Sequence, residues 1–340
     1  MTRNRHLAIG PAILLLAGLL SAQSLDIPSH GWGLSFGNSK NFTGLRFNYR
    51  DRGVERVRGL NFTLWQPYEL DDIDSLVQGL SLGLIPGGGT LHGVQIGVLG
   101  VAGIKNVRGI SVGLLGVGTG GSLVGINIGG IGAGAGDNVV GLNIGGLGLG
   151  AGGNVAGINI GGLGVGAGGN LTGLSFGLLG LGASDDVKGI NIAGLGMGAG
   201  RNLAGLNIAG IGMGAGEKVS GLNIACIAVG AGDVLGGITV AGIAAGATEI
   251  RGLAFAGAAV GGQTIKGIVA SAGCTLVTQG GELRGGVVAP VNWIKGTQRG
   301  VAIGIVNYAW SLRGVQIGLV NIVRDNPSGR KVLPIINWNF

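Results

Sequence analysis

The chain has 340 residues, of which 80 are glycine and 7 are proline; 46% are hydrophobic, 11% are charged, and the formal net charge is +7. Glycine does not recur at every third position, which excludes a collagen triple helix, and abundant apolar residues with little charge are the opposite of a disordered composition. The basic residues form no run in the sequence, so we expect no nucleic-acid partner.

Residues 1–24 are typical of a secretory signal peptide. Arg3 and Arg5 precede an apolar run from Leu7 to Leu20, and Ser21-Ala22-Gln23 supplies a small-residue exit. The sequence therefore predicts export, with the mature protein at the cell surface, in the periplasm or in the outer membrane of a bacterium.

Residues 25–92 hold irregular repeats. Segments that open at Gly33, Gly44 and Gly59 share the order glycine, apolar, polar, apolar, with bulkier and more charged residues at the polar places. Terminal repeats are expected to be atypical because they cap the stack. An insertion before Gly79 lacks the spacing of a calcium loop and is expected to be a solvated surface loop; it carries Pro67, Asp71, Asp72 and Asp74.

Residues 93–251 repeat one sixteen-residue phrase, whose clearest copy runs from Gly141 to Ala156. We number the positions of each copy from 1 at the opening glycine, and each copy is named after that glycine. A fixed short period of this kind indicates a stack of similar units. The opening glycines stand at 109, 125, 141, 157, 173, 189, 205, 221 and 237.

Each copy holds two short alternating patterns that differ in phase. Leu142 and Ile144 are apolar at even positions, whereas Leu149 and Ala151 are apolar at odd ones. Alternation is typical of half-buried strands, and glycines between and after the two patterns favour corners. The repeat therefore predicts an all-β fold, a β-solenoid (parallel β-helix) of about 16-residue coils, with leucine, isoleucine and valine in interior rows.

Stacked coils would align identical residues in files. Position 3 predicts an asparagine file that can hydrogen-bond amide to amide along the stack. The outward places of the second strand are nearly all glycine, so we expect a bare face suited to self-association. The predicted structural ladder comprises Asn127, Asn143, Asn159, Asn191, Asn207 and Asn223.

Residues 252–340 have looser spacing and more aromatic residues, among them Trp293, Tyr308 and Trp338. Bulky rings that close the open end of the stack, an aromatic cap, are the first interpretation. The terminal phrase ending in Phe340 is also typical of outer-membrane barrels, so a barrel that acts as a passive channel is the alternative. The change of apolar phase within each copy argues against spanning strands.

The phrase Gly314-Val315-Gln316-Ile317-Gly318-Leu319-Val320-Asn321, echoed at Gly300 and Gly93, resembles bacterial surface repeat proteins built from G-[VL]-Q-I-G-L-x-N units. The resemblance covers mainly the C-terminal copies, and the central block departs from it by using asparagine for glutamine. It implies export and a surface location, without an activity to carry over.

No constellation in the sequence indicates catalysis, a cofactor or a metal. His30 and His92 lie far from cysteine or carboxylate partners at ligand spacing, and Asp185-Asp186 is expected to be a solvated corner. Cys226 and Cys274 are three copies apart, too far for a disulfide, so we expect two free, buried or half-buried thiols. The prediction is a non-enzymatic structural or adhesive surface protein, with outer-membrane association as a further expectation.

Overall fold

The computed structural model describes residues 24–29, 31–67 and 74–340, which form an all-β, parallel β-solenoid of about 17 turns with about 16 residues per turn. Residues 1–23 of the predicted signal peptide (residues 1–24) and Asp71 and Asp72 of the insertion lie outside the described residues. The chain divides into two compact units, unit 1 up to Gly153 and unit 2 from Asn154. Each unit is described by itself.

Unit 1 joins the irregular N-terminal repeats to the regular coils in one register. The opening glycines Gly33, Gly44, Gly59, Gly79 and Gly93 are direct partners on neighbouring parallel strands. The sequence irregularities therefore lie in the connections between strands. Its strands are β1 (Ser24–Ser29), β2 (Trp32–Gly37), β3 (Asn41–Arg50), β4 (Arg56–Trp65), β5 (Leu76–Gly83), β6 (Gly87–Gly97), β7 (Gly100–Gly113), β8 (Gly116–Thr119), β9 (Leu123–Gly129), β10 (Gly132–Ala135), β11 (Val139–Gly145) and β12 (Gly148–Ala151).

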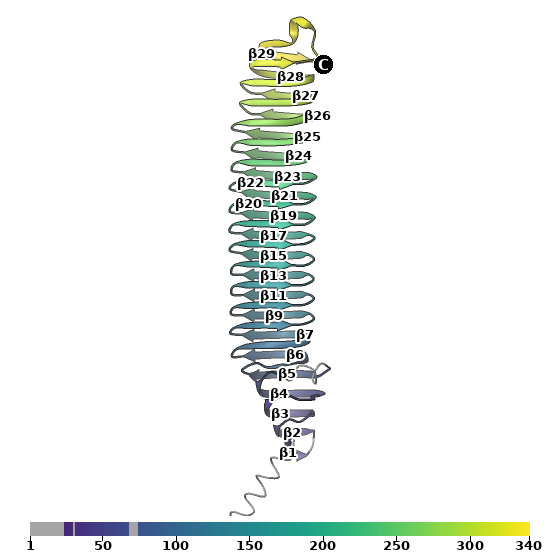
Figure 1. The fold of residues 1–340 in the computed structure, drawn as a ribbon, viewed down its shortest axis with the longest axis vertical. Helices are drawn as coiled ribbons and strands as arrows, with labels where there is room; N and C mark the ends of the chain where they lie inside the picture. Colours follow the sequence, from purple (N-terminus) through teal and green to yellow (C-terminus); the bar gives the residue numbers. More distant parts are fainter. Residues whose placement is uncertain (1–23, 30, 68–73) are drawn as a thin grey trace, which may run out of the picture. The chain divides into compact units, whose positions relative to one another are not determined.

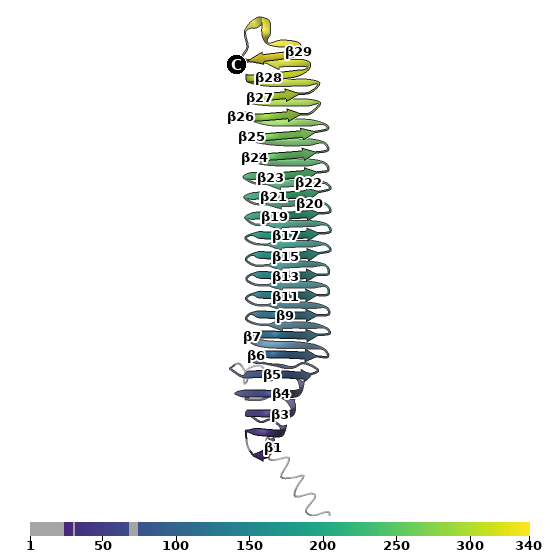
Figure 2. The ribbon, with the colours of Figure 1, turned by 180° about the vertical axis from the view of Figure 1, so that it is seen from behind.

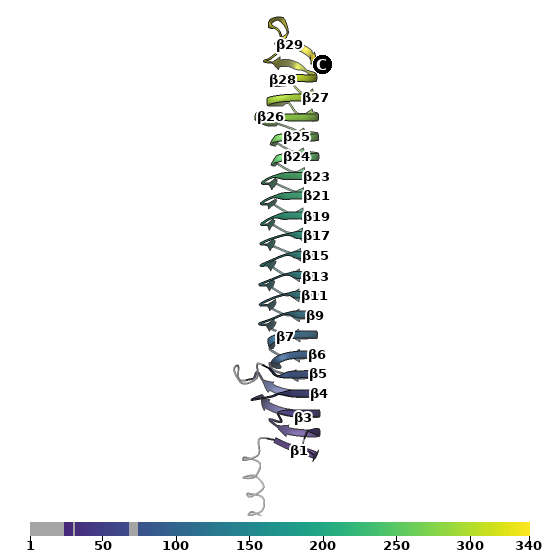
Figure 3. The same cartoon turned by 90° about the vertical axis from the view of Figure 1, so that its right-hand side faces the viewer.

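In unit 2 a long and a short strand alternate through most coils, and each pairs in parallel with its counterpart in the next coil. The long strands stack along one side of the coils (Figures 1 to 3). The strands are β13 (Val155–Gly161), β14 (Gly164–Ala167), β15 (Leu171–Gly177), β16 (Gly180–Ala183), β17 (Val187–Ala193), β18 (Gly196–Ala199), β19 (Asn202–Ala209), β20 (Gly212–Ala215), β21 (Lys218–Ala225), β22 (Ala228–Ala231), β23 (Val234–Ala241), β24 (Ala244–Ala256), β25 (Ala259–Ser271), β26 (Cys274–Val288), β27 (Val291–Ile303), β28 (Val306–Val323) and β29 (Val332–Asn339), with a 3-10 turn η1 (Ser328–Arg330) before the last.

The first and last strands run against the rest. β1 pairs antiparallel with β2, and β29 pairs antiparallel with β28. The last coil is thus covered by a strand instead of the ring cluster expected from the sequence. Trp293 and Tyr308 stack on each other with ring centroids 4.6 Å apart. The residues directly before and after each of them on the strand are buried, so the two rings point to the outer surface.

The parallel stacking contradicts the alternative of an outer-membrane barrel channel. Neighbouring coils pair position for position, for example Gly189 with Gly205 and Asn191 with Asn207. Strands of a spanning barrel are antiparallel and close on themselves. From β13 to β22 each long strand is followed by a short strand that belongs to a separate ladder, and the fold is a solenoid and not a barrel.

The side of the long strand that faces inward differs from the prediction. Asn143 and Asn207 are fully buried, whereas Ile158, Ile160 and their counterparts at positions 2 and 4 point outward. The interior of a regular coil is formed by the odd positions 3, 5, 9, 11 and 15. The expected phase flip at Gly145-Gly146 is therefore wrong, because the inward parity continues from one strand to the next.

The residue at position 15 explains this outcome. Val155, Leu171 and Leu203 are completely buried, and each lies on the same strand as position 3 of the following copy. Side chains two or four residues apart on a strand share one face. Once position 15 enters the core, the asparagine at position 3 must enter it too, and the aliphatic residues at positions 2 and 4 must face outward.

The opening glycine holds the coils together at close range. Every one from Gly33 to Gly314 has a φ between +83° and +146°, a region that side chains other than glycine rarely adopt. A Cβ on Gly205 would also lie 2.1 Å from the carbonyl oxygen of Gly189 in the coil before. This position is glycine in every coil because it needs both the backbone conformation and the space.

Candidate functional site

The predicted asparagine ladder lies inside the solenoid. In unit 1, Asn127 donates from Nδ2 to Oδ1 of Asn143 at 2.9 Å. In unit 2, Asn191 donates to Asn207 at 3.0 Å and Asn207 donates to Asn223 at 2.9 Å. All of these side chains are fully buried, so the ladder belongs to the core and offers no surface contact.

Ser175 interrupts the ladder in unit 2. Asn159 on one side turns its Nδ2 to the carbonyl oxygens of Gly157 and Thr172, at 3.3 and 3.4 Å. On the other side, Oδ1 of Asn191 is buried without a hydrogen-bond partner, as is the Oγ of Ser175 itself. The serine is too short to bridge the coils before and after it.

A second buried ladder occupies the last coils of unit 2, and sequence reasoning missed it. Asn292 donates to Asn307 and Asn307 donates to Asn321, both at 2.7 Å. These asparagines stand on the short-strand side of the coil. Asn307 and Asn321 are the last residues of two copies of the repeat phrase G-V-x-I-G-x-V-N. This recurrence was the signal in the sequence that could have predicted the second ladder.

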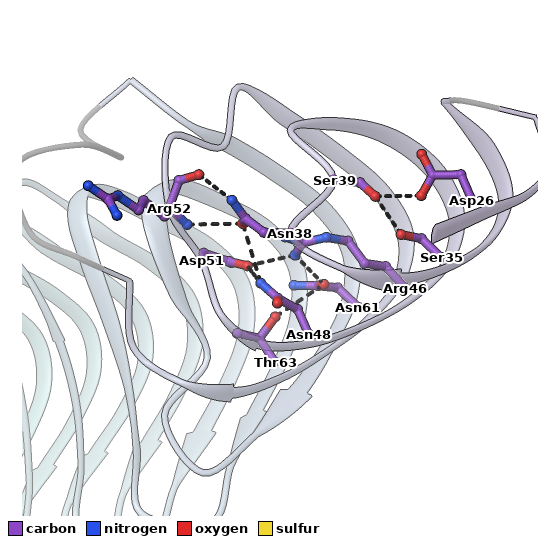
Figure 4. Close-up of polar contacts among 10 residues, drawn as sticks. All are labelled: Asp26, Ser35, Asn38, Ser39, Arg46, Asn48, Asp51, Arg52, Asn61 and Thr63. Atoms are coloured by element: carbon purple, nitrogen blue, oxygen red, sulfur yellow. Dashed lines mark hydrogen bonds and ion pairs between the residues drawn. The ribbon is translucent and has the colours of Figure 1, made fainter. Parts of the chain in front are cut away.

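The N-terminal coils of unit 1 contain a buried charged cluster (Figure 4). Arg46, which is fully buried at position 3, contacts Asp51 Oδ1 at 2.7 Å and donates to Asn61 Oδ1 at 3.0 Å. Asn48 donates to the same Asp51 oxygen at 2.6 Å. The sequence suggested that such charged residues face outward, which is wrong, because position 3 faces inward in these coils too. The cluster joins β3 to β4 and to the loop between them.

The main outward feature of unit 2 is a surface of large apolar side chains, which we call the aliphatic face. It comprises positions 2 and 4 of the long strands, and Ile190, Leu174 and Ile268 are 45%, 41% and 52% exposed. The face consists of Ile158, Leu174, Ile190, Leu206, Leu222, Ile238, Leu253, Ile268, Val301 and Val315 at position 2, and Ile160, Phe176, Ile192, Ile208, Ile224, Val240, Phe255, Ala270, Val288, Ile303 and Ile317 at position 4.

The corner next to the aliphatic face extends it. Position 7 carries leucine or isoleucine in every coil from Gly157 to Gly237, with exposed fractions of 43 to 50%. Contiguous apolar surface of this extent is rare on soluble monomers and marks an interaction site. The corner residues are Leu163, Leu179, Leu195, Ile211, Ile227 and Ile243.

A file of cations, the basic edge, borders the aliphatic face on the other side. Five consecutive coils place an exposed lysine or arginine directly before the opening glycine, and each is the register partner of the next. Two carboxylates, Glu249 and Glu282, neutralise part of this charge from the neighbouring corner, at 2.5 to 2.8 Å. The basic edge comprises Arg251, Lys266, Arg284, Arg299 and Arg313.

The basic edge is not visible in the linear sequence, because its cations stand fourteen to eighteen residues apart. Stacking brings them to the spacing of neighbouring parallel strands, roughly 4.8 Å. The recurring cation before an opening glycine was the signal that could have revealed it.

The ion pairs of the basic edge lower the pKa of the Glu249 carboxyl. Hydrogen bonds from Arg251, the larger cause, and from Lys266 bring this pKa from 4.5 to about 2.

Both units also contain an apolar groove on their outer surface. In unit 1 a groove of about 480 Å³ is lined by Phe47, Tyr49, Phe62 and Leu82 among others. In unit 2 a groove of about 400 Å³ lies where the small Ala270 stands between Phe255 and Val288 on the aliphatic face. The second groove lies in the same coils as the basic edge.

The remaining predicted chemistry residues lie apart. Cys226 and Cys274 are free; Cys274 is half-buried as expected, but Cys226 is exposed because it stands on a corner. Asp185 contacts Arg201 at 3.1 Å, whereas Asp186 is buried and contacts Lys188 at 2.7 Å and Arg201 at 4.0 Å, so both carboxylates are ion-paired and the corner is only partly solvated. A hydrogen bond from Lys188 lowers the pKa of Asp186.

His92 lies on the long-strand surface beside Arg108, while His30 falls outside the described residues. The described residues contain no group of three His, Cys, Asp or Glu side chains arranged to hold a metal ion, and none of their helical segments has the length and hydropathy to cross a bilayer.

Comparisons with protein-family models, with curated proteins and with solved protein structures find no match for this chain. The resemblance to surface repeat proteins therefore stays an expectation based on the repeat phrase.

Proposed function

We propose that the protein is a non-enzymatic, exported structural repeat protein that adheres through the aliphatic face. The observation that carries this proposal is the pair of apolar rows on the outer side of the long strands of unit 2, which Gly286 interrupts at position 2 and the small Ala270 narrows at position 4. Residues such as Ile190 and Ile268 keep 45% and 52% of their surface in contact with water. A partner that covers the rows would remove that surface from water.

The expected free energy favours the aliphatic face over the glycine face. Full burial of a large aliphatic side chain contributes about 1.5–3 kcal/mol, so covering the remaining 40% or so contributes on the order of 1 kcal/mol for each residue. Glycines on the opposite face, such as Gly166 and Gly198, have open space where a Cβ would stand and offer little apolar area. Self-association through the glycine face stays a weaker expectation.

Adsorption of the full chain to an alkyl-coated sensor tests the adhesive role. The double variant Ile190→Ser/Ile224→Ser removes two outward aliphatic side chains and should weaken adsorption about tenfold, whereas Gly198→Ser on the glycine face should leave it unchanged. Equal adsorption of all three proteins would contradict the proposal.

Cell fractionation tests export independently. The mature protein should be found outside the cytoplasm, in the envelope fractions or the medium. Recovery of the protein from the cytoplasm alone would remove the surface role, whatever the adsorption experiment shows.

A further inference from the structure

We infer that the aliphatic face of the C-terminal coils of unit 2 binds the surface of an anionic lipid bilayer, with the basic edge at the phosphate headgroups. This inference rests on the proposed adhesive function and names its partner. It concerns the coils from Gly252 to Gly314, where the apolar rows and the cations occur on the same strands.

The distribution of charge favours an anionic partner. The basic edge has five cations, and only Glu249 and Glu282 contact it among the described side chains. Arg313 has no acidic residue at the place that Glu282 occupies two coils earlier, because that place holds Ser311. The edge therefore has a positive excess that faces solvent.

A second copy of this chain fits the surface less well. The acidic residues of the unit 2 coils stand at the corner, three or four residues before the next opening glycine and beyond the basic edge, and none stands on the aliphatic face. Two copies that met through their aliphatic faces would not supply carboxylates to the cations. The acidic corner residues are Asp185, Asp186, Glu217, Asp233, Glu249 and Glu282.

A bilayer supplies both kinds of contact at once. Amphipathic surfaces bind at the boundary between headgroups and acyl chains, with their apolar side inserted and their cations at the anionic lipids. Along one strand, the cation before the opening glycine is four residues from position 4, roughly 13 Å at about 3.3 Å per residue. A lipid whose phosphate lies at Lys266 could thus place its acyl chain toward the groove at Ala270, on the same strand.

The absence of polar groups on the face fits a fluid partner better than a specific protein. Its rows repeat the same few aliphatic side chains, which offer no hydrogen-bond pattern by which one protein could be distinguished from another. Repeated contact of low specificity is sufficient for a lipid surface.

Vesicle co-sedimentation of the full chain tests the inference, with phosphatidylcholine vesicles that contain or lack 30% phosphatidylglycerol. We expect binding at least tenfold tighter with the anionic lipid, and weaker binding as salt is raised. Arg299→Gln/Arg313→Gln should weaken it by tenfold or more. Arg201→Gln/Lys218→Gln, which removes the same charge from the corner of earlier coils, outside the coils from Gly252 to Gly314, should have little effect.

A second pair of variants tests the apolar contact. Ala270→Glu places a carboxylate in the groove of the aliphatic face, and Gly261→Glu places one on the outer glycine side of the same strand, β25, where a Cβ meets only Leu276 at 3.8 Å. Only Ala270→Glu should abolish anionic-vesicle binding, and circular dichroism should show that both variants fold.

Two results would overturn the inference. One is equal binding to both kinds of vesicle; the other is anionic binding that Ala270→Glu leaves intact, which would indicate an electrostatic contact alone. If the alkyl sensor retains the protein but the vesicles do not, the lipid assignment fails and the adhesive function stands. If neither retains it, both fail.

Discussion

At the scale of single residues, the buried asparagine at position 3 is the least expected feature of this protein. A buried amide is costly unless it is hydrogen-bonded, and the stack solves this by joining each Nδ2 to the Oδ1 of the next coil, as from Asn191 to Asn223. The ladder has a direction, so its ends are unpaired: Asn191 lacks a donor to its Oδ1, and Asn223 lacks an acceptor for its Nδ2.

Replacement of Ser175 by asparagine should stabilise unit 2. The new amide could accept from Asn159 and donate to Oδ1 of Asn191, which has no partner now. A net hydrogen bond contributes about 1 kcal/mol, so the free energy of unfolding in urea should rise by about 1–2 kcal/mol. Ser175→Ala, which completes no ladder, is the control, and a loss of stability in Ser175→Asn would show that the coil cannot accept the longer side chain.

The ion pairs of Glu249 predict a pH dependence of stability. Its pKa falls from 4.5 to about 2 in the folded state because Arg251 and Lys266 donate hydrogen bonds to the carboxylate. A lowered folded pKa means that the stabilisation is complete above about pH 4.5 and is lost as pH falls through about 2. The difference in melting temperature between the wild type and Glu249→Gln should therefore shrink from pH 5 to pH 2. A constant difference would show that the carboxylate charge is not responsible.

At the scale of the strand, one glycine in each coil sets the approach of neighbouring backbones. Gly205 has a φ of +115° and no room for a Cβ, whereas Gly198 on the outer side of β18 has no atom within 4 Å of that place. The two glycines are seven residues apart but serve different purposes. The first determines the spacing of the coils, and the second leaves the outer surface bare.

Alanine substitution should separate these two kinds of glycine. Gly205→Ala should destabilise the protein by about 3 kcal/mol or more, since backbone strain and steric overlap each contribute roughly 1–3 kcal/mol. Gly198→Ala should change the free energy of unfolding by less than about 1 kcal/mol. Chemical denaturation of both variants measures the difference, and similar values for the two would refute the role given to position 1.

At the scale of the whole molecule, the stack of parallel strands leaves ladders that could continue. β29 covers β28 in antiparallel pairing, with its Asn337 buried and accepting from Asn326. An uncovered edge strand is a template for pairing with another chain. The end strands therefore limit growth of the stack.

Removal of residues 327–340, which include β29, should expose the edge of β28 and promote assembly through strand pairing. We expect concentration-dependent oligomers in sedimentation velocity at concentrations where the full chain does not associate. A truncated protein with the same sedimentation behaviour as the full chain would show that β29 does not protect the edge.

The sixteen-residue period by itself determined that this chain stacks as a β-solenoid, because equal spacing of glycines such as Gly189 and Gly205 allows identical residues to align coil on coil. It also determined the corners and the asparagine file, since both repeat with the same period. The long strand, however, has apolar residues of both parities, Val155 on one side and Ile158 and Ile160 on the other, so alternation alone could not choose the inner face. The tertiary structure decided which face of the long strand is inside, because the short strand faces the long one and buries the side with position 15. That choice placed the asparagines inside and the isoleucines outside, and stacking then brought distant cations such as Arg299 and Arg313 together into the basic edge.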